Sequence, residues 1–119
     1  MKRKFRIITV NHQKYAWWFS FQHGVKLHFS PQQDKTAGIT VDFPSETSDD
    51  FYAVFPLFIS MQKAGISCRI KLIEPKMSSL LIAYLQDDFQ SRKQIFLNGF
   101  DLLSEMGWHV SGIENGFDW

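Results

Sequence analysis

The segment KYAWWFSF, residues 14–21, carries five aromatic rings in eight positions, and its two tryptophans are adjacent. Successive side chains of a β-strand point to opposite faces, so Trp17 and Trp18 cannot both enter one core. The apolar face of such a strand would hold the other large rings, namely Tyr15, Trp17, Phe19 and Phe21. Trp18 would share the second face with Ala16 and Ser20. The segment therefore predicts a strand with one buried face, and Trp18 either lies under a helix or marks a contact surface.

The same alternation of apolar and polar residues runs through the first 43 residues. It predicts strands near 4–10, 14–21, 25–29 and 39–43, joined by polar turns. One of these turns, His23–Gly24, suits a two-residue hairpin because glycine accepts a positive φ. Four sequential strands with short turns predict an antiparallel meander that is apolar on one face.

The second part of the chain, about 48–106, shows mainly helical spacing of apolar residues. This spacing predicts a helix over about 50–63, which either begins at Pro56 or is kinked there. A second helix is expected to open at Glu74–Pro75, because proline is accepted in the first helical turn.

A last helical stretch is expected over about 90–106. Asn98–Gly99 weakens this helix, and the sequence leaves open whether the helix is interrupted there. One further strand is expected near 66–73, where apolar residues alternate again. The tail from residue 111 is expected to be irregular.

These elements predict a single α+β domain spanning 1–119. Its sheet would be a four- to five-stranded, mainly antiparallel meander, packed on one face by two or three helices. A chain of 119 residues can bury a core without disulfides or metals.

Charge and targeting signals narrow the class of protein. Thirteen basic and twelve acidic side chains give a net charge of +1, so no strong global field attracts nucleic acid or an anionic membrane.

The single cysteine, Cys68, excludes an intrachain disulfide and suits a reducing compartment. The start MKRKFRIITVN lacks the apolar run of a signal peptide, and no segment is long enough for a membrane span. We expect a cytoplasmic, bacterial-type protein with no membrane association.

Three short pieces of the chain form a pattern: Tyr15 and Trp17 in KYAW, the segment IEPKMSSLLIAYL, and Gly107–Trp108. With them the chain resembles small, functionally uncharacterised bacterial α+β proteins. In those proteins an early strand carries a Tyr-x-Trp pair, a proline-initiated helix follows a later strand, and a Gly-Trp lies near the C-terminus. The stretch between the proline helix and Gly-Trp is longer here than in that group. The resemblance implies a fold rather than a function.

No motif in the sequence predicts catalytic, cofactor-binding or metal-binding residues. Cys68 lies on the apolar side of its strand, where a buried, inert thiol is expected. The four histidines lack the i, i+4 pairing of a zinc site, and His28 is expected to be a solvated strand residue. The pairs Asp49–Asp50 and Asp87–Asp88 are expected to be solvated charges. The sequence leaves open whether the protein is an enzyme, and the missing catalytic motifs favour a non-enzymatic protein.

Aromatic rings on a sheet face beside basic residues can stack the bases of a nucleic acid. Trp18 with Lys14 and Lys26 fits that pattern, but the near-neutral charge argues against nucleic-acid binding.

Two functional hypotheses follow from these observations. The leading one is a non-enzymatic module that binds a protein partner or associates with itself. Its contact surface would comprise Trp18, Lys14, Ser20, Lys26 and His28. The alternative is a small-ligand binder or enzyme with a pocket between sheet and helices. That pocket would be lined by Tyr15, Tyr84 and His109.

Overall fold

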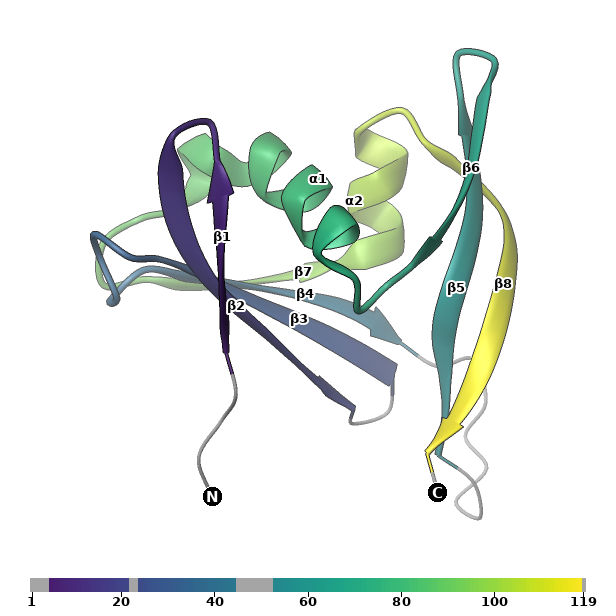
Figure 1. Cartoon of the computed structure of the whole chain (residues 1–119), viewed down its shortest axis with the longest axis horizontal. Coiled ribbons are helices and arrows are strands. Elements are labelled where there is room, and N and C mark those ends of the chain that lie inside the picture. The colour runs from purple at the N-terminus through teal and green to yellow at the C-terminus, as the bar shows by residue number, and fades with distance from the viewer. Residues whose placement is uncertain (1–4, 22–23, 45–52, 119) are drawn as a thin grey trace.

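The computed structural model describes residues 5–21, 24–44 and 53–118, and these form an α+β protein. Its two sheets have five and three strands, are mostly antiparallel, and are accompanied by two α-helices (Figure 1). The predicted α+β class is therefore confirmed, but the strands form two sheets where a single sheet was predicted.

The five-stranded sheet, here called sheet A, has the order β1-β2-β3-β4-β7. Its first four strands pair antiparallel in sequence order, and β7 joins the far edge parallel to β4. The strands are β1 (Arg6–Val10), β2 (Gln13–Phe21), β3 (Gly24–Pro31), β4 (Gly38–Pro44) and β7 (Gln94–Asn98).

The three-stranded sheet, sheet B, is antiparallel and has β5 in its centre. Its strands are β5 (Ala53–Lys63), β6 (Ile66–Lys71) and β8 (His109–Asp118). Helix α1 (Pro75–Leu85) follows β6 and leads into a 3₁₀ turn, η1 (Gln86–Asp88), while α2 (Gly99–Glu105) links β7 to β8. Both helices lie on one side of sheet A (Figure 1).

The prediction of a helix over 50–63 was wrong where the structure describes it, because Ala53–Lys63 forms β5. Its apolar residues are so dense that they satisfy helical spacing as well as the alternation that buries Ile59 and Met61. Pro56 is accommodated because the register with β8 shifts between Pro56 and Phe58. The first residues of the predicted helix, up to 52, lie outside the described part of the chain.

The last predicted helix, 90–106, was wrong over Gln94–Asn98, which forms β7. Only Gly99–Glu105 is helical, and Asn98 begins it by accepting a hydrogen bond from the Asp101 N–H through its side-chain oxygen at 3.0 Å. The tail was also predicted wrongly, because it pairs with β5 as β8. The helix at Pro75 is confirmed, and the strand near 66–73 is confirmed over Ile66–Lys71.

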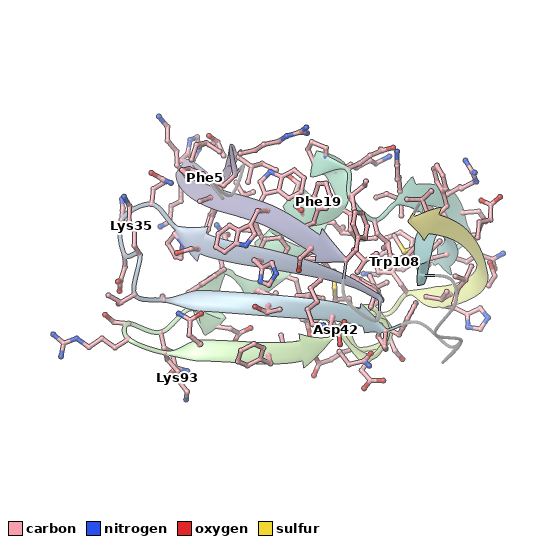
Figure 2. All side chains as sticks on the ribbon, turned by 90° about the horizontal axis from the view of Figure 1, so that it is seen from below. Phe5, Phe19, Lys35, Asp42, Lys93 and Trp108 are labelled. Carbon is pink, nitrogen blue, oxygen red and sulfur yellow. The ribbon has the colours of Figure 1, made fainter. Side chains whose placement is uncertain are left out.

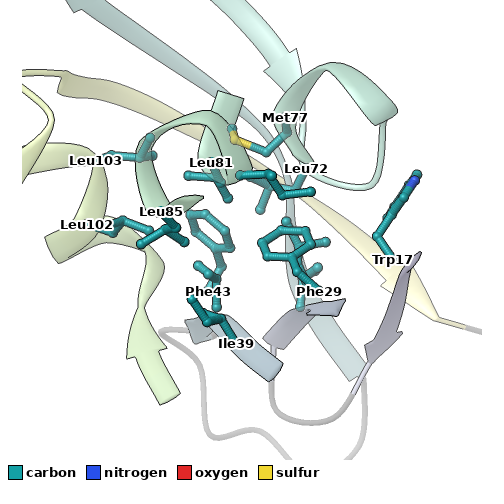
Figure 3. Packing of buried hydrophobic residues seen from close by; sticks show 14 of the residues in the cluster. Trp17, Phe29, Ile39, Phe43, Leu72, Met77, Leu81, Leu85, Leu102 and Leu103 are labelled. Carbon is teal, nitrogen blue, oxygen red and sulfur yellow. The ribbon is translucent and has the colours of Figure 1, made fainter. Parts of the chain in front are cut away.

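The core joins the inner face of sheet A to both helices and to sheet B. Figure 3 shows part of it: Phe29, Ile39 and Phe43 come from sheet A, Met77, Leu81 and Leu85 from α1, and Leu102 and Leu103 from α2. Within β2, Tyr15 and Trp17 are buried as predicted, whereas Phe19 is half-buried and Phe21 is exposed. The apolar face of β2 therefore leaves the core towards the end of the strand.

The Tyr15 hydroxyl connects β2 to the end of α1. It donates a hydrogen bond to Gln13 Oε1 at 2.9 Å and accepts one from Gln86 Nε2 at 3.2 Å. The same Gln86 nitrogen donates to the Val10 carbonyl at 3.2 Å. This network fixes the β1–β2 hairpin against the helix, so the strand that carries Trp18 on its other face is firmly placed.

Candidate functional site

The predicted contact residues all lie on the outer face of sheet A, opposite the helices. Lys14, Trp18 and Ser20 alternate along β2, and β3 places His28 opposite Trp18 and Lys26 opposite Ser20. Figure 2 looks onto this side of the sheet, with Phe5, Lys35 and Asp42 labelled on or around it. The structure therefore brings Trp18, Ser20, Lys26 and His28 together, with Lys14 farther along β2.

A chain of hydrogen bonds crosses this face through three adjacent strands. Ser20 Oγ on β2 lies 3.1 Å from His28 Nε2, and His28 Nδ1 lies 3.1 Å from Thr40 Oγ1 on β4. The register that pairs His28 with both Trp18 and Thr40 creates this row. The imidazole is thereby held by a hydroxyl group on each side.

The Trp18 ring stacks on the same imidazole. The two ring centroids are 5.2 Å apart and the planes differ by 14°. The two adjacent tryptophans of KYAWWFSF are therefore placed differently. Trp17 is in the core, whereas Trp18 is half-buried on the opposite face against His28. Because the histidine is fixed by its hydrogen bonds, the tryptophan is presented in a defined orientation.

The Ser20–His28–Thr40 row has the order of a nucleophile, a base and an orienting group. Its third member, however, is a neutral hydroxyl. A hydroxyl cannot stabilise an imidazolium as the aspartate of a serine hydrolase does. Both ring nitrogens are already hydrogen-bonded within the row, so what the row supports best is a fixed ring on which Trp18 stacks.

Exposed apolar residues flank the row at both edges of the sheet. Phe96 on β7 is 75% exposed, while Phe5 beside β1 and Ile7 on β1 are 58% and 48% exposed. Sequence reasoning missed these residues and Thr40. Alternation within β1 and β4 could have indicated Ile7 and Thr40, but Phe96 was hidden in a predicted helix.

A hollow of about 310 Å³ adjoins Trp18 at the end of the face that carries the β3–β4 loop. Its walls are the rings of Phe5 and Trp18 with Ala16, and the Lys35 side chain and Ser30 add polar groups. A smaller hollow of about 80 Å³ continues from Trp18 and Lys35 to His28, Thr40 and Gln94. Together they form a shallow groove across the outer face with Trp18 in its middle.

The residues proposed for the alternative pocket lie on three separate elements. Tyr15 is buried in β2, Tyr84 is exposed on α1, and His109 is exposed at the start of β8. None of these three lines either hollow beside Trp18.

Cys68 is half-buried on β6 and has a free thiol. Among residues 5–21, 24–44 and 53–118, no three His, Cys, Asp or Glu side chains gather as a metal site would require. Within the same residues, no helix is long and apolar enough to cross a membrane.

Comparison of the chain with protein-family models, with curated proteins and with solved structures finds no match.

Proposed function

We propose that the protein is a non-enzymatic binding module that recognises a protein partner through the outer face of sheet A. The observation that carries this proposal is the Trp18 ring, fixed on His28 beside an aromatic-walled hollow. Tryptophan held in one orientation loses little entropy on binding, and it is among the residues that contribute most to protein interfaces.

The charges on this face define the chemistry of the partner. Lys14, Lys26 and Lys35 lie on or beside it, and its acidic member, Asp42 on β4, lies directly opposite Lys26, so the cationic excess is at Lys14 and Lys35. A second copy of the chain would present the same cationic residues, so self-association is disfavoured electrostatically. The matching partner is a peptide segment with an aromatic side chain for the hollow and carboxylates on either side of it.

The flanking residues extend the contact area. Phe96, Ile7 and Phe5 are exposed on opposite edges of the same sheet, and exposed apolar residues that share a face mark an interaction surface. A segment lying across the strands would reach from the hollow beside Trp18 towards Phe96 on β7.

A defined peptide tests the proposal. The probe Ac-Glu-Glu-Phe-Glu-Glu-NH₂ should shift the tryptophan indole N–H resonances of the protein in two-dimensional NMR titrations. Trp18→Ala should weaken binding by roughly 30-fold, as expected for about 2 kcal/mol lost at an interface tryptophan. Tyr84→Ala, which removes an exposed ring from α1, is the matched control and should bind as the wild type does.

Several outcomes would overturn the proposal. Trp18→Ala should keep its melting temperature within a few degrees of the wild type, so an unfolded variant would show that Trp18 belongs to the fold. Equal binding of Ac-Lys-Lys-Phe-Lys-Lys-NH₂ would refute the charge argument. Stronger binding of oligo(dT) would show a nucleic-acid surface instead, and a dimer in light scattering that Trp18→Ala dissociates would show self-association.

A further inference from the structure

A second and larger hollow lies between α1, the end of β1 and the β5–β6 hairpin. Its volume is about 580 Å³, and it shares no lining residue with the hollows beside Trp18. Figure 1 shows α1 and this hairpin on the same side of sheet A. The hollow is thus separate from the outer-face groove.

The walls of the hollow are mainly apolar and come from regular elements. Helix α1 contributes Lys76, Ser79, Leu80 and Ala83, whose spacing places them along one side of the helix. The opposite wall is made by alternate residues of β6, namely Ile66, Cys68 and Ile70. Val10, Met61 and Trp108 complete the apolar lining.

Lys76 is the only charged residue among the described residues that line this hollow. It lies in the first turn of α1, and Glu74 at the N-cap is the acidic residue at this end of the helix. In the described part of the chain, no ion pair joins Lys76 to a carboxylate. The Lys76 ammonium group therefore favours a negative charge at this end of the hollow.

The dimensions of the hollow match a small molecule. Its volume falls within the range of ligand pockets, about 300–1,000 Å³. From Lys76 to Ala83 the helix rises about 10 Å at 1.5 Å per residue. A ligand with an anionic group near Lys76 and an apolar body of that length would lie along α1 against Ile66, Cys68 and Ile70.

We infer that this hollow binds a small amphipathic monoanion, an alkyl or aryl carboxylate. The carboxylate pairs with the Lys76 ammonium, and the hydrocarbon body packs between the Leu80 side of α1 and β6. This site does not depend on the proposed partner surface, and either can fail without the other.

Three probes of equal chain length separate the charge contribution from the apolar contribution. Octanoate, octanol and octylammonium should be titrated into the full chain, with binding followed by calorimetry. The two ions are kept below their micelle concentrations and octanol below its solubility limit. Octanoate should bind most tightly and octylammonium most weakly. Cys68 is the single cysteine of the chain, so the rate of its reaction with a maleimide reports occupancy directly, and octanoate should slow that reaction.

Two variants locate the site. Lys76→Gln should weaken octanoate binding roughly tenfold, as expected for a lost charge-assisted contact, and leave octanol binding unchanged. Lys93→Gln, at an exposed lysine outside the lining, is the matched control. Ala83→Phe should abolish binding by filling the hollow, and because Ala83 is exposed the fold should tolerate the larger side chain.

The inference is overturned if the three probes bind equally, or if octanoate does not protect Cys68. It is also overturned if Lys76→Gln or a folded Ala83→Phe protein binds octanoate as the wild type does. Circular dichroism of each variant establishes that it is folded. Loss of peptide binding by Trp18→Ala would leave all of these results unaffected.

Discussion

Replacing Gly99 with alanine has two opposite effects on stability: alanine has the higher helix propensity, but its methyl group clashes with the core. Gly99 is the first residue of α2, and a Cβ built on it would lie 2.4–2.6 Å from three atoms of the Phe43 ring. Carbon atoms at such separations are well inside van der Waals contact. Phe43 is fully buried and its ring also meets Phe100 edge-on at 5.2 Å, so it has little room to withdraw.

The two effects have opposite signs and comparable sizes. Within a helix, alanine is favoured over glycine by about 1 kcal/mol. Overpacking a buried site costs roughly 1–3 kcal/mol, and at Gly99 the close atoms belong to an aromatic ring in the core. Because Gly99 begins the helix, it gains less than an interior position would. We therefore expect Gly99→Ala to lower the free energy of unfolding by about 1–2 kcal/mol. At about 4 °C per kcal/mol for a chain of this length, this corresponds to a decrease in Tm of roughly 4–8 °C in total.

Urea unfolding followed by tryptophan fluorescence measures this change. Gly112→Ala is the matched control, because its Cβ would meet the Ser60 Cβ at an ordinary 3.9 Å, and its stability should stay within about 0.5 kcal/mol of the wild type. Combining Gly99→Ala with Phe43→Leu should cost less than the sum of the two single changes, because leucine gives the new methyl group space. A Gly99→Ala protein as stable as the wild type would refute the argument that Phe43 requires glycine here.

Two further predictions concern hydrogen-bonded polar residues. Asn98→Ala should cost about 1 kcal/mol in urea unfolding, because the Asp101 N–H loses its capping acceptor. Asn98→Ser should restore most of the loss, and equal stability of the alanine variant would contradict the capping role. The pKa of Asp34 lies below its ordinary value of 3.8, chiefly because the Thr36 side chain donates a hydrogen bond to the carboxylate, with Ser91 and the Thr36 N–H contributing next. A lowered folded-state pKa adds stability above the unfolded-state value, and this is lost as pH falls through the folded-state value. The melting temperature of Asp34→Asn should therefore fall less steeply below about pH 4 than that of the wild type. An equally steep fall in both proteins would show that the carboxylate is not coupled to folding.

The sequence predicted the strands of the first half well because each strand has one clearly apolar face. Alternation placed Tyr15 and Trp17 in the core and set Trp18 apart on the other face, and the structure agrees. The same rule reaches its limit in β5, where nearly continuous apolar residues fit both a helix and a buried strand. Pro56 fitted the predicted helix only as its start or as a kink, whereas a register shift in a strand accommodates proline.

Some residues of the candidate site could likewise be predicted from the sequence, and others could not. Lys14, Trp18, Ser20, Lys26 and His28 could be assigned to one face because β2 and β3 are consecutive strands of a hairpin. Thr40 and Phe96 could not be added, since their positions depend on the registers of β3 with β4 and of β4 with β7. The hollow at Lys76 is lined by residues as far apart in the sequence as Thr9 and Trp108, and only the packing of α1 against sheet B creates it.

By itself, then, the sequence determined the local periodicity, the apolar faces and the isolation of Trp18, because these follow from side-chain direction along a strand. The tertiary structure alone decided that 53–63 is the centre of a second sheet, that β7 closes the first sheet, and that Trp18 stacks on His28. These outcomes depend on pairing between segments far apart in the chain. Such pairing is governed by register and by burial of the whole fold, so a local pattern does not contain it.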